Sequence, residues 1–230
     1  MKSRLKFFLT LGLSVALMGA ATAAQDAAEE KKPAAQVGQP APAFTLKDTK
    51  GTEHKLEDYK GKIVVLEWVN PQCPVCRMAH EDGRVASMVK TFKEMDDVVF
   101  LGINSSYTTT AEENDSALAR YKIEYPVLLD VEGTVARLYG ARTTPHLFVI
   151  DPEGVLRYQG ALDNDHTGNK TRAGEDVTNY ALNAVKQIQA GETVSPETTR
   201  SYGCSVKFAP KDRDKGKSDT RPGRDRGRQR

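Results

Sequence analysis

Two of the three cysteines stand two residues apart in the segment WVNPQCPVCRMAH at 68–80. A Cys-x-x-Cys pair can exchange disulfides with other thiols, and with a nearby histidine it can bind a soft metal ion. The apolar run KIVVLEWV at 62–69 is typical of a buried strand, and apolar residues recur at helical spacing after the pair. We therefore expect the pair at a strand-to-helix junction, with Pro74 in the first helical turn.

This junction predicts different properties for the two sulfurs. Unpaired N–H groups and the helix dipole at a helix start favour an anion, here the Cys73 thiolate. Cys-x-x-Cys pairs in such a position have thiol pKa values of roughly 3.5–7.5, against about 8.5 for a free cysteine. Cys73 is therefore predicted to be the accessible attacking sulfur. Cys76, one turn deeper, is predicted to be the buried resolving sulfur that closes an intramolecular disulfide.

Glu67 interrupts the apolar strand six residues before Cys73. A carboxylate in a buried strand is costly unless it has a partner or a task. We predict that Glu67 accepts a proton from Cys76 during exchange. The alternative is an ion pair with Lys62 or Arg77, or a strand end that faces water.

The alternative to disulfide exchange is that the same cysteines bind a metal ion. His80 follows Cys76 by four residues, on the same helical face. With His80 or His146, the pair Cys73 and Cys76 would offer thiolate and imidazole ligands, which suit copper and zinc. A non-catalytic metal-binding chaperone is therefore the alternative from a different class, while a packing role for His80 needs no metal. No metal or other cofactor is assigned.

Cys204 is the odd cysteine, and an unpaired thiol is notable in an exported protein. We expect it to be buried behind Tyr202 and Phe208. The alternatives are a second-stage disulfide with Cys73 and a link between subunits.

The elements that position these residues alternate along the chain. A hairpin closed by Lys50 and Gly51 comes first, and a second hairpin turns at DPEG (151–154). A mixed sheet between helices, an α/β sandwich, is the arrangement that this order favours. The predicted strands are 62–69, 98–104, 126–130, 146–150 and 155–160, the predicted helices are 75–92, 111–121, 134–139 and 177–190, and 163–176 is predicted to be a loop.

The two ends of the chain differ in charge and composition from the residues between them. Of the net charge of +2, the first 24 residues contribute +3 and the last 20 contribute +5, so the residues between them carry −6. Nothing in this acidic body indicates a nucleic-acid-binding surface, which would need clustered Lys and Arg on the folded part. The predicted parts are a signal peptide (1–24), a linker (25–36), the main domain (37–191), a segment packed on it (192–210) and a disordered basic tail (211–230).

The first 24 residues indicate where in the cell we expect the protein to be. A basic start, an uncharged apolar run and a small-residue end are the pattern of a secretory signal peptide. We therefore expect export to the periplasm or cell envelope. Membrane association is expected only if this segment is retained as an anchor.

Three segments in the right order resemble the thioredoxin superfamily, in its redoxin (AhpC/TSA-like) branch. The resemblance implies a thioredoxin-like α/β fold with a mixed central sheet flanked by helices and an N-terminal hairpin extension. The segments are VGQPAPAFTLKDTKG (37–51), YKGKIVVLEWVNPQCPVC (59–76) and YGARTTPHLFVIDPEGVLRYQGALD (139–163), and RSYGCSVKF (200–208) is similar to the end of bacterial redoxin-domain proteins.

The same resemblance implies roles for individual residues. Cys73 is the nucleophile, Cys76 the resolver and Glu67 the buried acid. Pro145 is in the cis conformation facing the pair, and the backbone of Thr144 pairs with a bound substrate strand. Trp68 and Pro74 complete the predicted substrate-binding residues.

The expected activity is therefore thiol:disulfide exchange between the Cys73–Cys76 pair and protein disulfides or dithiols, with an electron donor that is not identified. The Pro-Val dipeptide between the cysteines lacks the histidine of strongly oxidising members, which favours a reductant. A peroxiredoxin-like antioxidant peroxidase is the alternative, although neither cysteine has the Thr or Ser of the Pro-x-x-x-Thr/Ser-x-x-Cys motif. The sequence does not predict the oligomeric state.

Overall fold

The computed structural model describes residues 34–122 and 124–209 of the chain. The predicted signal peptide, most of the linker and the basic tail lie outside the described residues. Within the described ranges, no helix has the length and apolar character needed to cross a membrane.

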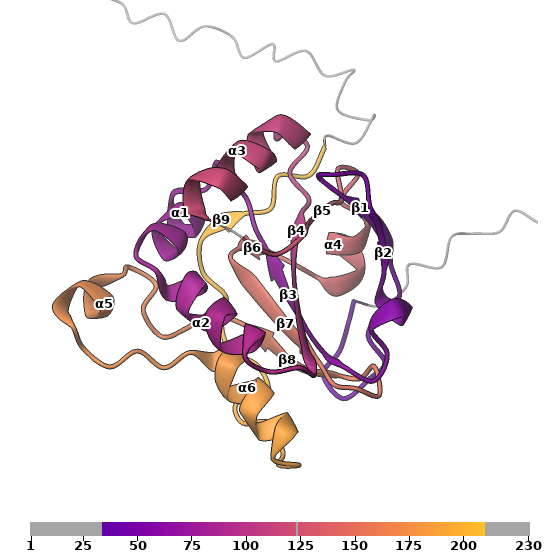
Figure 1. Ribbon diagram of the computed structural model, residues 1–230, viewed down its shortest axis with the longest axis vertical. Helices are drawn as coiled ribbons and strands as arrows, with labels where there is room; N and C mark the ends of the chain where they lie inside the picture. The colour runs from indigo at the N-terminus through magenta and orange to yellow at the C-terminus, as the bar shows by residue number, and fades with distance from the viewer. Residues whose placement is uncertain (1–33, 123, 210–230) are drawn as a thin grey trace, which may run out of the picture. The chain divides into compact units, whose positions relative to one another are not determined.

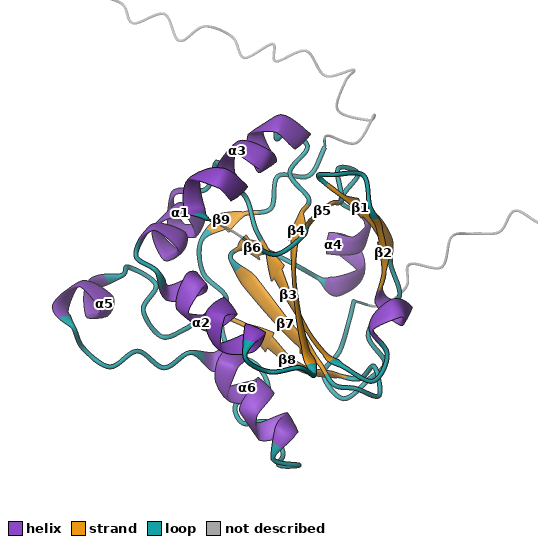
Figure 2. Cartoon of the chain, viewed as in Figure 1, coloured by secondary structure: helices purple, strands orange, loops and turns teal. Residues whose placement is uncertain are grey.

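A seven-stranded mixed sheet forms the centre of the fold, in the order β2-β1-β5-β4-β3-β7-β8 (Figures 1 and 2). The central strand β3 is buried at every residue, as its continuous apolar run predicts. It pairs in parallel with β4 and antiparallel with β7. The α/β fold with a mixed sheet and an N-terminal hairpin is confirmed. The strands are β1 (Thr45–Asp48), β2 (Glu53–Lys55), β3 (Ile63–Trp68), β4 (Val98–Asn104), β5 (Val127–Leu129), β7 (His146–Ile150) and β8 (Leu156–Gly160).

Helices cover both faces of this sheet. Side chains alternate along β3, so Ile63 and Val65 pack on one face with α1, α2 and α6, while Val64 and Leu66 pack on the other face with α4. We call these the cysteine face and the α4 face, because Cys73 and Cys76 belong to the first core. The helices are η1 (Leu56–Tyr59, a 3-10 helix), α1 (Pro74–Glu81), α2 (Arg84–Lys93), α3 (Ala111–Tyr121), α4 (Thr134–Tyr139), α5 (Asn169–Ala173) and α6 (Tyr180–Gln189).

Two predicted elements differ from the structure. The helix predicted over 75–92 is two helices, because the backbone at Gly83 adopts a left-handed conformation with φ of 83° and ends the first helical run. The loop predicted over 163–176 contains the short helix α5.

The chain after α6 returns across the sheet edge, and we call residues 197–208 the strap. Its first part follows β8, where Gln159 N–H donates to the Glu197 carbonyl and the Gln159 carbonyl accepts from Thr199 N–H. Its second part contains β9 (Cys204–Ser205), which pairs antiparallel with β6 (Thr143–Thr144). In Figure 1 this yellow segment crosses to lie beside β6.

Candidate active site

Cys73 is the N-cap of α1, directly after the turn that follows β3. Cys73 N–H donates to the Asn70 carbonyl at 3.0 Å, and the Cys73 carbonyl accepts the first helical bond, from Arg77 N–H, at 2.9 Å. Pro74 occupies the first helical turn, where its missing N–H leaves no bond unmade. Cys73 Sγ accepts from Cys76 N–H at 3.5 Å. The junction therefore holds the sulfur against the helix start, as the sequence predicts.

The loop before β7 closes the other side of Cys73. The peptide bond between Thr144 and Pro145 is cis, as the family resemblance implies. The Thr144 carbonyl oxygen lies 3.1 Å from Cys73 Sγ and accepts a hydrogen bond from its thiol. Cys73 therefore lies between the N-terminal turn of α1 and this proline loop.

The two sulfurs differ in acidity in the predicted direction. Burial raises the pKa of the Cys73 thiol, but hydrogen bonds from the Cys204 and Thr144 side chains and from the backbone of Cys76 and Cys204 outweigh it and bring that pKa below its ordinary value. Burial, and then the negative charge of Glu67, raise the pKa of Cys76 well above the ordinary value. At neutral pH, Cys73 is thus the better nucleophile and Cys76 keeps its proton.

Glu67 is fully buried on the cysteine face. Its Oε2 accepts from the Tyr125 hydroxyl at 2.9 Å, while its Oε1 has no hydrogen-bond partner among the described residues. His80 Nε2 lies 3.6 Å from Oε1, too far for a hydrogen bond. Because ligand atoms of Glu67, Cys76 and His80 lie within 4.8 Å of one another, the carboxylate is close enough to exchange a proton with the thiol. The alternative partners Lys62 and Arg77 form no ion pair with it among the described residues.

The structure does not leave Cys73 accessible, contrary to the sequence prediction. Only 1% of Cys73 is exposed, the same fraction as for Cys76. The proline loop and the strap cover it, since β9 pairs with β6 at Thr144. The backbone edge of Thr144 that was expected to bind a substrate strand is therefore occupied by the chain itself.

Cys204 also differs from its expected place. It is half-buried against the core that contains Cys73 and Cys76, within hydrogen-bonding reach of Cys73. Phe208 does not cover it, because that ring packs on the α4 face with the Arg137 guanidinium 4.5 Å from its centroid. No local pattern could have shown this, because 130 residues separate Cys73 from Cys204 in the sequence.

Of the other predicted substrate-binding residues, Pro74 is exposed at the start of α1, but Trp68 does not line the site. Trp68 is fully buried on the α4 face, where its Nε1 donates to Ser105 Oγ at 3.0 Å. The physical reason is strand alternation, since Glu67 points to the cysteine face and its neighbour must point away.

Of the expected metal ligands, the structure brings together Cys76 and His80 but not Cys73 and His146. The His146 ring lies 4.5 Å from the Phe148 ring, on the α4 face, and its Nδ1 accepts from Arg142 N–H at 3.3 Å. The cluster of potential ligands among the described residues is Glu67, Cys76 and His80, and it contains neither Cys73 nor His146. A site made of Cys73, Cys76 and His146 is thus wrong for this fold.

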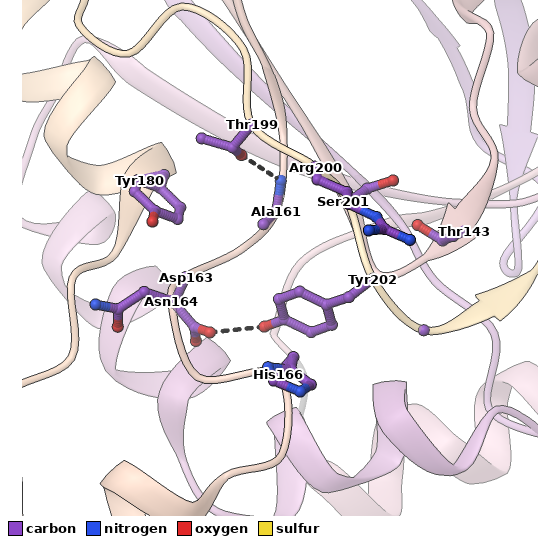
Figure 3. Close-up of a pocket in the computed structure, with 11 residues that line it drawn as sticks. Thr143, Ala161, Asp163, Asn164, His166, Tyr180, Thr199, Arg200, Ser201 and Tyr202 are labelled. Carbon is purple, nitrogen blue, oxygen red and sulfur yellow. Dashed lines mark hydrogen bonds between the residues drawn. The ribbon is translucent and has the colours of Figure 1, made fainter.

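A cavity of about 760 Å³ lies beside the strap, and the sequence did not predict it (Figure 3). Its wall includes Thr143 next to the proline loop, and Tyr202 and Gly203 from the strap. The Tyr202 hydroxyl donates to Asp163 Oδ1 at 2.7 Å, as the dashed line shows. The cavity therefore opens next to the segment that covers Cys73.

Comparison with known proteins agrees with this geometry. A profile of the AhpC/TSA family matches residues 37–159, more than half of the chain. The chain belongs to the AhpC/TSA family. The thiol-disulfide oxidoreductase ResA of Bacillus subtilis is 30% identical over 155 residues, which cover 67% of this chain and 84% of ResA. The peroxiredoxin TSA1-B of Candida albicans is 34% identical over 139 residues, 53% of this chain and 67% of that protein.

The fold of this AhpC/TSA member has relatives among solved structures. The crystal structure of a hypothetical protein from Sinorhizobium meliloti 1021 superposes with a TM-score of 0.68 at 26% identity, covering 78% of this chain and 98% of that one. The fold is thioredoxin-like. Family, relatives and fold together make the chain a thioredoxin-like redox enzyme of the thiol-disulfide oxidoreductase family.

Proposed function

We propose that the protein exchanges electrons between the Cys73–Cys76 dithiol and protein disulfides, acting as a reductant. One observation carries the proposal. Cys73 lies at the N-terminal turn of α1, within 3.5 Å of Cys76 N–H, and its pKa is lowered while that of Cys76 is raised. This pairs a more acidic attacking sulfur with a protonated resolving sulfur.

The exchange has two steps. The Cys73 thiolate attacks one sulfur of the substrate disulfide, which forms a mixed disulfide and releases the first substrate thiolate. Cys76 then gives its proton to Glu67 and attacks Cys73, so that the Cys73–Cys76 disulfide forms and the second substrate thiolate leaves. An external dithiol donor restores the pair. The charge of Glu67 opposes a second negative charge nearby, so proton transfer and attack must be coupled.

Substrate binding in this proposal uses the surface around the proline loop and not the backbone edge of Thr144, which the strap occupies. Thr144 and Pro145 border Cys73, and exposed Pro74 lies at the start of α1. The cavity beside Tyr202 offers space for the substrate residues next to the disulfide. Export to the periplasm or cell envelope is also proposed, and its support is the pattern of the first 24 residues.

The test is insulin-disulfide reduction with dithiothreitol as donor. Cys73→Ser should lower the rate over background by about 100-fold or more, because no attacking thiolate remains. In Cys76→Ser/Cys204→Ser, Cys73 is the only cysteine, so it should form a mixed disulfide that persists until dithiothreitol is added. Ser87→Ala, at an exposed position of α2, is the control and should keep the wild-type rate. Wild-type rates from Cys73→Ser would refute the proposal.

The peroxidase alternative has support from the peroxiredoxin relative but not from the site. Asn70 stands three residues before Cys73, where the peroxide-binding motif has a threonine or serine. The Asn70 side chain accepts from Gln72 N–H at 2.8 Å. We therefore favour disulfide exchange over peroxide reduction.

A further inference from the structure

The strap places a third thiol beside the Cys73–Cys76 pair. In the β6–β9 ladder, Cys204 stands opposite Thr144, and Thr144 Oγ1 donates to the Cys204 carbonyl at 3.5 Å. The Thr144 carbonyl is also the group 3.1 Å from Cys73 Sγ. The pairing of β6 with β9 therefore places Cys73 and Cys204 next to the same residue, Thr144.

The N-terminal turn of α1 contacts both of these sulfurs. Cys76 N–H donates to Cys73 Sγ, and Val75 N–H donates to the Cys204 sulfur. Backbone N–H groups at a helix start stabilise thiolates, so each sulfur has a donor when it carries the charge. In the reduced protein, burial and then the neighbouring Cys73 raise the pKa of Cys204, so the proton stays on Cys204.

Specific residues permit the close approach of the strap. A Cβ at Gly203 would lie 2.1 Å from the Thr144 carbonyl oxygen, and the residue has φ of 114°, so only glycine fits there without strain. On the other side, Tyr202 donates to Asp163, which is held by Arg84 in a buried ion pair at 2.9 Å. Cys204 is therefore held in place by the contacts of Tyr202 and Gly203 and by the pairing of β9 with β6.

Because the strap and the proline loop leave Cys73 almost fully buried, any thiol exchange at Cys73 takes place next to Cys204. We propose that Cys204 is a second resolving thiol, held by the strap at Cys73, which exchanges with the Cys73–Cys76 disulfide. The inference rests on the proposed function, because the disulfide that it consumes is the one that this function forms.

This exchange needs no oxidant or reductant from outside the chain. The Cys204 thiolate attacks Cys73 Sγ, so the Cys73–Cys204 bond forms as the Cys73–Cys76 bond breaks. Cys76 leaves as a thiolate and takes up the proton that Cys204 gave up, and no electron enters or leaves the protein. In a mixed disulfide between Cys73 and a substrate, the same attack releases the substrate thiolate and leaves the Cys73–Cys204 bond.

Peptide mapping of the oxidised full chain tests this inference. Trypsin cleaves after Lys62, Arg77, Arg200 and Lys207, which separates both cysteine segments. The wild-type protein and Cys76→Ser are treated with glutathione disulfide, alkylated, digested without reductant and analysed by mass spectrometry. In Cys76→Ser, peptide 63–77 should be linked to peptide 201–207. In the wild type, the same link should appear beside the Cys73–Cys76 disulfide, with Cys76 alkylated.

The control moves the thiol by one residue, to the opposite side of β9. In Cys76→Ser/Cys204→Ser/Ser205→Cys, the new thiol stands at exposed position 205 opposite Thr143. We expect at least tenfold less of the link than in Cys76→Ser. Equal yields would overturn the inference, as would a Cys76→Ser protein with no link.

The two proposals fail in different ways. If the wild-type protein reduces insulin but neither protein shows the link between peptides 63–77 and 201–207, only the role of Cys204 is wrong. If the wild-type protein neither reduces insulin nor forms the Cys73–Cys76 disulfide, the proposed function is wrong, and with it the exchange that depends on it.

Discussion

Cys73 has three hydrogen-bond partners around one sulfur, and its acidity should depend on the one that the strap supplies. The contact from Cys204 lowers the pKa of Cys73 against the effect of burial. Cys204→Ala removes this donor, whereas Cys204→Ser keeps a hydroxyl that can replace it. When each substitution is combined with Cys76→Ser, Cys73 is the only cysteine, and we expect its thiol pKa to be higher in the alanine variant than in the serine variant.

Ultraviolet thiolate absorbance against pH measures this difference directly. Equal pKa values in the two variants would mean that the Cys204 side chain contributes no donor, and that the remaining hydrogen bonds lower the pKa of Cys73.

The Glu67 charge should have the opposite effect on Cys76. After burial, it is the main cause of the raised pKa of that thiol. Glu67→Gln removes the charge, so in a protein with Cys76 as its only cysteine the thiol pKa should fall. Tyr125→Phe is the control, because it removes the hydrogen bond to Glu67 Oε2 but keeps the charge, and it should not lower the Cys76 pKa. In the enzyme with all its cysteines, Glu67→Gln should still slow release of the substrate, because the proton acceptor is lost.

Which site residues could be predicted depends on how far apart they lie in the sequence. Cys73, Pro74 and Cys76 act through one helical turn, so their spacing predicts their geometry. Glu67 stands out because a carboxylate is rare in a buried strand. Its proximity to His80 depends on how α1 packs on β3, and no local pattern reports that packing.

At the scale of elements, the strap can be released by a single change. Gly203→Ala places a Cβ against the Thr144 carbonyl, so β9 should separate from β6. Cys73 should then react with iodoacetamide at least tenfold faster than in the wild type, because its cover is lost. Gly191→Ala is a matched control, since that glycine also has a positive φ, of 71°, but nothing lies within 4 Å of its Cβ position. An unchanged reaction rate in Gly203→Ala would show that the proline loop alone covers Cys73.

The predicted elements agree with the structure where local signals are strong. The boundaries of β4, α3 and β7 match the predicted ranges because turn residues or changes of hydrophobic period mark both ends. The pairing of β6 with β9 was not predicted, because a two-residue strand has no period and its partner is about sixty residues away. Such contacts come from tertiary packing, which a single sequence does not display.

At the scale of the whole molecule, both sheet faces exclude water, and titratable groups buried there should make folding depend on pH. His146 is the clearest case on the α4 face. Burial, and then the positive charge of Arg142, lower its pKa from 6.5 to about 4. Between these values the unfolded chain binds more protons than the folded one, so the free energy of unfolding must fall as the pH falls.

A pKa shift of this size changes the free energy of unfolding by at most about 3 kcal/mol. Urea unfolding between pH about 7 and about 4 measures it. In His146→Asn, the amide oxygen can still accept from Arg142 N–H but does not titrate, so the loss of stability over this range should be smaller than in the wild type. His166→Asn, at an exposed position, leaves the buried ring in place and should keep the wild-type slope. The lowered pKa values of Asp48, Asp165, Glu112 and Glu124 also reduce the stability towards a pH of about 4, but they do so equally in all three proteins and cancel in the comparison. Identical slopes in wild type and His146→Asn would therefore mean that His146 takes up its proton without unfolding.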